Sequence, residues 1–242
     1  EAVETMSKEC ISYKDDNFAK YSNVWTQSRE TFINEFLQTG GGMSEPDKVT
    51  GKQEPLKPTL DDFGEQIGSY RKSQNDIRLI QDSHSFGWLR VDCRPLKQSL
   101  DLNLGKWVYL FTHYLNNEML NQLKDFKQFL HDAHAGLDVK VSKGDIDQLI
   151  AVLEAMLLVR TKAPMYEKLF DHLKATVALL KQHGVTVTDA LQQRIEEGPD
   201  QWQELKNTWS SVQDKTAPFQ QEETQRLRQV EDNFIEQLNE LR

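Results

Sequence analysis

The sequence contains little that could cross-link or anchor the chain. Its only cysteines, Cys10 and Cys93, lie far apart and have no spacing suited to a zinc site or a redox pair. We therefore expect no disulfide framework and a reducing compartment. No stretch approaches the roughly 18 to 20 apolar residues that span a bilayer. The N-terminus also lacks the basic and then apolar layout of a secretory signal.

An excess of basic residues is missing as well. The formal net charge is -9, from 29 Lys and Arg against 38 Asp and Glu, and basic and acidic residues are interleaved in every segment. Such a surface repels polyanions, so nucleic acid and acidic filaments such as microtubules are not expected as direct partners. Prolines and glycines are few enough, at 7 and 12, to predict a soluble helical protein rather than a disordered one.

Long helical periodicity is what the sequence does contain. From about Pro95 to the C-terminus, apolar residues recur every three or four positions in three segments joined by two short turns. The seam of the first segment would extend over roughly 60 Å at 1.5 Å per residue. Its positions are Leu96, Leu100, Leu104, Trp107, Phe111, Leu115, Met119, Leu123, Phe126, Leu130, Ala133 and Leu137. Short turns between long helices predict antiparallel neighbours, and thus an up-down-up, spectrin-like three-helix bundle.

The second and third segments continue the pattern across prolines. We expect Pro164 to kink or split the second helix, and Gly198-Pro199 and Pro218 to interrupt the third, because proline removes a backbone hydrogen bond. The second stripe is Ile146, Ile150, Leu153 and Leu157, then Leu169, Leu173, Val177 and Leu180. The third is Trp202, Leu205, Trp209 and Val212, then Leu227, Val230, Phe234, Leu238 and Leu241.

Glycines and one acidic residue mark the predicted helix ends of this bundle. Gly136 and Gly184 stand where a left-handed residue would end the first and second helices. Asp145 with Gln148 offers a cap for the start of the second.

A pair of helices is predicted ahead of the bundle. The first has an aromatic face, formed by Ile11, Phe18, Tyr21, Trp25, Phe32 and Phe36. The second begins at Thr59, whose hydroxyl can cap the helix together with Asp62. Its buried stripe would be Phe63, Ile67, Tyr70, Ile77 and Ile80.

The segments around this second helix are predicted to be a loop and a strand. A Gly- and Pro-rich loop spans residues 39–58 and includes Gly51-Lys52. This pair does not form a nucleotide-binding loop, because Pro46 stands where the leading glycine belongs and Gln53 replaces the metal-binding hydroxyl. Residues 86–93 alternate apolar and polar and predict a short strand. The fold class is therefore all-α with elongated helical bundles: residues 1–85 form the helical pair and residues 86–242 the three-helix bundle.

No constellation of residues predicts chemistry. His131 and His134 with Asp132 share a helix face, but the Glu-x-x-His pairs of a bundle metal centre are missing from the sequence. The pairs Asp82 with His84 and Asp171 with His172 have no nucleophile in a recognisable elbow, which favours surface pairs. We therefore expect no catalytic, cofactor-binding or metal-binding residues.

Five tryptophans could line a pocket or a partner groove, since tryptophan is enriched at binding hot spots: Trp25, Trp88, Trp107, Trp202 and Trp209. Trp107, Trp202 and Trp209 lie on apolar seams and are expected in the core. Trp88 lies in a connector, and we expect it to dock onto the bundle and fix the angle between the helical pair and the bundle.

Several motifs occur in an order that resembles one family. They are WLRVDCRPLKQSL at 88–100, Lys106-Trp107, Gly144-Asp145, LLVR at 157–160, LFDHLK at 169–174 with Leu179-Leu180, residues 191–202 with EEGP at 196–199, and APFQ at 217–220. Together they resemble the N-terminal tail of dynein heavy chains, the axonemal (ciliary or flagellar) type in particular. The resemblance covers most of residues 86–242 and is only loose before Phe86.

The resemblance implies a fragment of the tail, ahead of the linker that swings across the motor ring. The ATP sites and the microtubule-binding stalk of the family lie elsewhere in the heavy chain, which is a microtubule-based ATPase motor. The segment itself would then be non-catalytic, without direct stalk contact to microtubules. The helical pattern of the sequence runs up to both Glu1 and Arg242, which likewise suggests an excerpt of a larger protein.

The family tail associates heavy chains and carries intermediate and light chains. The implied role is a scaffold that links the motor to its associated chains and axonemal cargo and transmits force. Its implied partners are other dynein subunits (heavy, intermediate and light chains) and neighbouring axonemal components, with no nucleic acid and no membrane. The implied location is the cytoplasm and the axoneme of a cilium or flagellum.

Two other classes remain open from the residues alone. One is a spectrin-like helical adaptor module of another large cytoskeletal protein. The other is a small helical enzyme, which would need a deep polar pocket and shifted titratable groups. If the segment is a scaffold, bending is expected to concentrate at Pro164, Gly198-Pro199 and Pro218.

Overall fold

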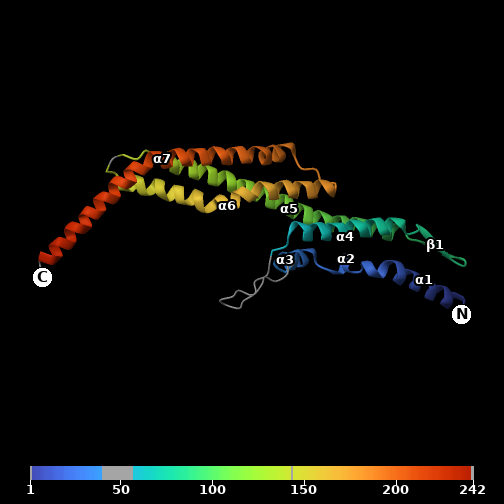
Figure 1. Ribbon diagram of the computed structural model, residues 1–242. Helices are drawn as coiled ribbons and strands as arrows, with labels where there is room; N and C mark the ends of the chain where they lie inside the picture. Colours follow the sequence, from blue (N-terminus) through green and yellow to red (C-terminus); the bar gives the residue numbers. More distant parts are fainter. Residues whose placement is uncertain (1, 40–56, 143, 241–242) are drawn as a thin grey trace. The chain divides into compact units, whose positions relative to one another are not determined.

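The computed structural model describes residues 2–39, 57–142 and 144–240, and these are almost entirely helical (Figure 1). This confirms the all-α class of helical bundles. The loop predicted at 39–58, with Gly51-Lys52, lies almost wholly outside the described residues. In chain order the elements are α1 (Ala2–Phe18), η1 (Ala19–Tyr21), α2 (Asn23–Thr26), α3 (Arg29–Thr39), α4 (Leu60–Leu79), β1 (Ser83–Phe86), β2 (Leu89–Asp92), α5 (Arg94–Leu137), α6 (Ile146–Gln182) and α7 (Asp189–Glu240).

The chain divides into two compact units. One comprises residues 1–118 with 175–186, and the other residues 119–174 with 187–242. The domain division expected between residues 85 and 86 stays a prediction, and that boundary falls inside β1.

The aromatic core of the first unit centres on Trp107 and Phe111 of α5, both at most 1% exposed. The Trp107 ring stacks on Tyr70 of α4 at 5.5 Å between centroids, and Phe32 of α3 meets it edge-on at 5.4 Å. Phe36 packs edge-on against Phe111 at 5.3 Å. α3, α4 and α5 are therefore held together by aromatic contacts, which add to the free energy of burying apolar area.

The helix predicted around the first aromatic face is broken. It consists of α1, η1, α2 and α3, and Gln27 after α2 is extended, with φ -85° and ψ 134°. The break leaves the Val24 carbonyl without the partner that a continuous helix would supply, and the Trp107 Nε1 donates a hydrogen bond to it at 3.0 Å. Two residues of the predicted face, Ile11 and Trp25, are about half exposed.

α4 begins as its sequence predicts. The Asp62 amide donates to the Thr59 hydroxyl at 3.3 Å, and the Asp62 carboxylate accepts from the Thr59 amide at 2.7 Å, which completes a capping box. These hydrogen bonds hold the pKa of Asp62 below its ordinary value.

The extended segment around Trp88 is a hairpin rather than the single strand predicted for residues 86–93. β1 pairs antiparallel with β2, and Gly87 at the turn has φ +60°, a conformation that favours glycine. Trp88, in the same turn, is 71% exposed, so the expectation that it docks onto the bundle is wrong. Its position in the hairpin turn leaves most of the side chain exposed to solvent.

The seam predicted for α5 is confirmed. Eleven of its twelve positions are buried, and only Leu96, in the first turn, is 40% exposed. Steps of three and four residues keep these side chains on one face of the helix over its whole length.

The core of the second unit is built from α5, α6 and α7. Phe126 and Phe129 of α5 meet Tyr166 of α6 at 5.1 and 4.6 Å, and Trp202 of α7 lies 5.9 Å from Tyr166. Trp202 is buried as predicted. Trp209 is half-buried, and its Nε1 donates to the Met156 carbonyl at 3.1 Å.

α6 packs with a different face from the one predicted. Leu149, Val152, Met156 and Val159 are its buried residues in the first half, whereas Ile146, Ile150 and Leu157 are 41%, 47% and 64% exposed. Both sets have helical spacing because this helix is apolar over a wide arc, and periodicity alone does not choose between them. Beyond Pro164 the prediction holds better, since Leu173, Val177 and Leu180 are buried.

The prolines do not split α6 or α7, although α7 bends along its course (Figure 1). α6 runs through Pro164 without splitting, and α7 runs through Gly198, Pro199 and Pro218. A proline removes one backbone hydrogen bond, and buried side chains on both sides of it can hold the helix together. Ile195 and Trp202 provide such packing around Gly198-Pro199.

Two of the glycines behave differently from each other. Gly184 has φ +74° and ends α6, as expected. Gly136 is still inside α5 and does not adopt the left-handed conformation, so the prediction that it ends the helix is wrong. A Cβ there would lie 2.7 Å from the Cβ of Ala155, so glycine permits close approach of α5 and α6.

The predicted cap of α6 is present, since the backbone amide of Gln148 donates to Asp145 Oδ1 at 3.1 Å.

A pH dependence of the first unit follows from the end of α6. Burial lowers the pKa of His183 from its ordinary 6.5, with the nearby Arg71 guanidinium as a second cause. The folded state therefore binds fewer protons than the unfolded state below pH 6.5, and stability should fall as the pH drops from there through the lowered folded pKa.

Urea unfolding between pH 7.5 and pH 5 would measure this fall. His183→Gln, which cannot titrate, should flatten the profile in that range while leaving the steeper acid loss below the ordinary carboxyl pKa. An identical profile in both proteins would contradict this assignment.

Candidate functional site

One surface feature of the second unit is an exposed apolar stripe on α6. Helix residues four positions apart lie on neighbouring turns of one face, and Ile146 and Ile150 have this spacing at one end of the stripe. Isolated apolar residues on a surface are ordinary, but a run of them along one helix is typical of a contact surface. The exposed members are Ile146, Ile150, Leu157, Leu158 and Met165, at 41% to 64%.

A second exposed apolar surface follows on α7. Leu227, Val230, Phe234 and Ile235 are 48% to 63% exposed, although they continue the helical spacing of the buried residues Trp202 and Leu205. Leu241 lies outside the described residues, and the side chain of Leu238 is not described. An amphipathic helix gains most of its stability by packing its apolar face, so this part of α7 is suited to a partner helix.

A truncation tests whether this part of α7 contributes to the unit alone. Removing residues 227–242 should leave the thermal midpoint of the second unit nearly unchanged, because the described apolar side chains removed are exposed. Removing residues 213–242 also takes away Thr216, which is 3% exposed, and should lower the midpoint clearly. Circular dichroism melts of both truncated chains would measure this, and a large loss from the shorter deletion would show that the segment has a partner in the unit.

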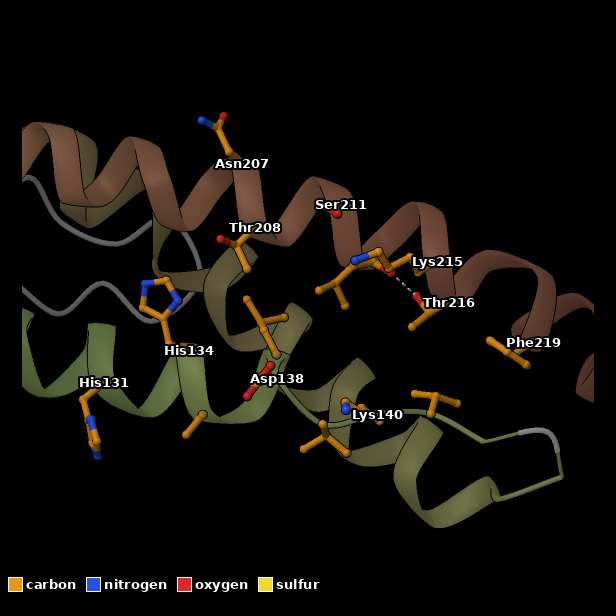
Figure 2. Close-up of a pocket in the computed structure, with 15 residues that line it drawn as sticks. His131, His134, Asp138, Lys140, Asn207, Thr208, Ser211, Lys215, Thr216 and Phe219 are labelled. Carbon is orange, nitrogen blue, oxygen red and sulfur yellow. Dashed lines mark hydrogen bonds between the residues drawn. The ribbon is translucent and has the colours of Figure 1, made fainter.

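A groove lies between the C-terminal end of α5, the residues that follow it, and α7 (Figure 2). Its volume is about 1030 Å³, and His134, Asp138 and Lys140 line it opposite Thr208 and Lys215. Figure 2 shows the His134 ring on the side of α5 that faces α7 and the His131 ring on another side. The two histidines that share a face by sequence thus do not converge on one point.

The polar groups of this groove are mixed in character. Lys140 and Lys215 are basic and Asp138 is acidic, and the Thr216 hydroxyl donates to the Val212 carbonyl of its own helix at 2.9 Å. Among the residues that the structure describes, no three His, Cys, Asp or Glu side chains are grouped so as to hold a metal ion. The expected absence of catalytic, cofactor and metal residues stays a prediction.

Titratable groups with shifted pKa values lie in structural positions. Burial raises the pKa of Tyr70 to about 12 beside Trp107 in the first core. Hydrogen bonds from Arg94 lower the pKa of Asp92 to about 2, and the shortest of them, from Arg94 Nη2, is 2.7 Å. These shifts reflect core packing and the start of α5.

The two Asp and His pairs of the sequence lie in different surroundings. Asp82 accepts from Lys97 Nζ at 2.6 Å, whereas the His84 ring stacks on Tyr13 at 4.5 Å. Asp171 and His172 lie on the exposed surface of α6. No helix in the described ranges has the length and hydropathy of a membrane span.

One pair that sequence reasoning missed is Cys10 with Cys93, which line the same small pocket. Their separation in the sequence concealed this. The only signal in the sequence was that each cysteine lies next to an apolar segment: Cys10 on α1 and Cys93 just before α5.

Comparison with known proteins gives a consistent result. The chain is 31% identical over 239 residues to dynein axonemal heavy chain 17 of Homo sapiens, a match that covers 97% of the chain. It is 30% identical over 226 residues to dynein axonemal heavy chain 11 of Sus scrofa and 26% identical over 261 residues to the flagellar outer-arm dynein beta chain of Chlamydomonas reinhardtii, with 92% and 96% of the chain covered.

These matches extend the resemblance to the region before Phe86, where the motifs alone gave little. The chain spans only 5% to 6% of the length of these curated relatives. No model of a protein family matches it. Over nearly its whole length, the chain is a dynein heavy-chain segment of the axonemal type.

Proposed function

We propose that this segment belongs to the heavy-chain tail ahead of the linker, and that it is a non-catalytic scaffold. It links the microtubule motor to associated chains and axonemal cargo in the axoneme of a cilium or flagellum. The observation that carries the proposal is the pair of exposed apolar surfaces on α6 and α7, which are presented by helices with well-packed cores. Surfaces of this kind are suited to binding other helical subunits.

The packing of the helices supports a role in transmitting force. Close-packed interiors resist compression, so displacement at one end of a packed helix is passed along it rather than absorbed. α6 and α7 are not split at their prolines, which favours a connected segment over a chain of independent pieces. The aromatic contacts of Tyr166 with α5 and α7 fix the three helices of the second unit against one another.

The partners we propose are the other dynein subunits: heavy, intermediate and light chains, together with neighbouring axonemal components. Apolar side chains on α6 would contribute most of the binding free energy if they become buried in the complex, at about 25 cal/mol per Å² of apolar area. The groove of Figure 2 lies in the same unit and is lined by polar groups of α5, the residues after it and α7.

A double variant of the α6 stripe tests this proposal. Ile150→Ser with Leu157→Ser changes two side chains that are 47% and 64% exposed, so the fold should be retained. Binding to a purified complex of axonemal intermediate and light chains, measured by analytical ultracentrifugation, should weaken at least tenfold. Glu154→Ser with Lys168→Ser, two exposed polar positions of α6, is the matched control and should bind like the unaltered chain.

Equal binding by both double variants would rule out the α6 stripe as the contact. Absence of binding by the unaltered chain to any purified dynein subunit, with the helices intact by circular dichroism, would contradict the scaffold role itself.

A further inference from the structure

The two cysteines of the chain meet in one pocket of the first unit. The pocket has a volume of about 180 Å³ and lies between α1 and the residues that join β2 to α5. Cys10 comes from α1 and Cys93 from the junction just before Arg94, where α5 begins. They are brought together across 83 positions of the sequence.

Tyr13 shows that the two thiols lie on facing surfaces. It follows Cys10 by three residues, so the two share a face of α1. Tyr13, Cys10 and Cys93 all line the same pocket. The face of α1 that carries Cys10 is therefore the face turned toward the pocket that Cys93 lines.

The elements on both sides of the pocket are held in place. The Tyr13 ring stacks on His84 at 4.5 Å and meets Phe86 edge-on at 5.7 Å, which fixes α1 against the hairpin. The Cys93 amide donates to the Asp82 carbonyl at 2.7 Å, which fixes the backbone at the second thiol. A disulfide requires two cysteines whose backbones lie close together, and these contacts hold α1 and the residues before α5 at the same pocket.

The two thiols differ in access. Cys93 is 4% exposed, and burial raises its pKa, with the nearby Cys10 as a further cause. Cys10 is partly exposed and can be reached from solvent. Since the thiolate is the attacking species, the accessible cysteine reacts first and the buried one second.

We propose that Cys10 and Cys93 form a thiol–disulfide exchange site that reacts with small disulfides such as oxidised glutathione and closes into an intramolecular disulfide. This site is independent of the scaffold role proposed above. Its chemistry needs no group besides the two thiols and the small disulfide.

The reaction has two exchange steps. The Cys10 thiolate attacks one sulfur of the small disulfide, whose S–S bond breaks and releases one reduced thiol; Cys10 then carries a mixed disulfide. The Cys93 thiolate attacks the Cys10 sulfur and releases the second thiol. In total the protein loses two electrons and two protons, and the small disulfide gains them as two thiols.

The product joins α1 to the start of α5. A disulfide restricts the unfolded chain, and more so when the enclosed loop is long. The bond would therefore raise the melting temperature of the first unit and leave that of the second unit unchanged.

The test uses the full chain incubated with oxidised glutathione at pH 8, followed by intact-mass measurement and peptide mapping. We expect a mass lower by two hydrogens, a peptide pair joined through Cys10 and Cys93, and full reversal by a reducing dithiol. The melting transition of the first unit should rise by several degrees. Cys10→Ser should abolish the reaction, and Cys93→Ser should stop it at the stable glutathione adduct on Cys10.

Because Cys93 is buried, Cys93→Ala serves as a second variant if Cys93→Ser folds poorly, and it should give the same stable adduct. A stable adduct on Cys10 in the unaltered chain, with Cys93 still reduced, would overturn the proposal. So would a disulfide-linked dimer or no reaction at all.

Discussion

Replacing Trp107 with Ala is expected to lower the stability of the first unit by about 3–5 kcal/mol, the range found when a buried aromatic residue is truncated. The side chain is 1% exposed and contacts Phe32 and Tyr70. Its Nε1 also satisfies the Val24 carbonyl, so the substitution leaves a buried acceptor unpaired. The loss therefore combines a cavity, lost aromatic contacts and a lost hydrogen bond.

Urea unfolding followed by circular dichroism would measure this change in the transition of the first unit. Trp107→Phe separates the hydrogen bond from the packing contribution, because it retains a ring and removes the hydrogen bond. It should lower the free energy of unfolding by less than the alanine variant does. Trp88→Ala is the matched control: Trp88 is 71% exposed, so its removal should change the free energy of unfolding by no more than about 0.5 kcal/mol. A large loss from Trp88→Ala would restore the idea that this residue docks onto the bundle.

Gly198→Ala is expected to destabilise the second unit even though alanine favours helix. A Cβ at this position would lie 2.0, 2.5 and 3.0 Å from three atoms of the Phe170 ring. That ring is 5% exposed and is held edge-on by Phe126 at 5.1 Å, so it cannot move aside freely. Overpacking costs about 1–3 kcal/mol and more for severe clashes, which exceeds the roughly 1 kcal/mol gained from helix propensity.

Gly68→Ala is the control, for which the expected change in stability has the opposite sign to that of Gly198→Ala. Gly68 lies inside α4, and nothing is within 4 Å of the position its Cβ would take, so alanine should stabilise by about 0.5–1 kcal/mol. Thermal melts of the two single variants would compare them directly. Combining Gly198→Ala with Phe170→Leu should recover part of the loss, because the smaller side chain makes room for the methyl group. A stabilised Gly198→Ala protein would show that α6 and α7 are less closely packed at this point.

The α5 seam illustrates what periodicity predicts well. One face of α5 is apolar and the rest is largely polar, so only one orientation buries the apolar side chains, and eleven of the twelve predicted positions are buried. The cap at Thr59 and Asp62 and the end of α6 at Gly184 were predictable for a similar reason. Each depends on a hydrogen bond or a backbone conformation formed within a few residues.

The surface proposed for binding could not be predicted in the same way. α6 carries two apolar stripes of helical spacing, and the stripe predicted as core, with Ile150 and Leu157, is the one left exposed. The cysteine pocket also depends on contacts between residues far apart in the chain. The ordered motifs indicated the dynein heavy chain correctly, because such a set of matches rarely arises by chance, but they do not say which face meets a partner.

By itself, the sequence determined that the chain is helical, where α4 begins and α6 ends, which face of α5 is buried, and the family to which the segment belongs. The tertiary structure decided which stripe of α6 enters the core, that α7 continues through Gly198-Pro199, and that Gly136 and Gly198 serve close contact between helices. The physical reason is range: capping and periodicity act within one helix, whereas the choice among apolar faces depends on the side chains that neighbouring helices bring to meet it.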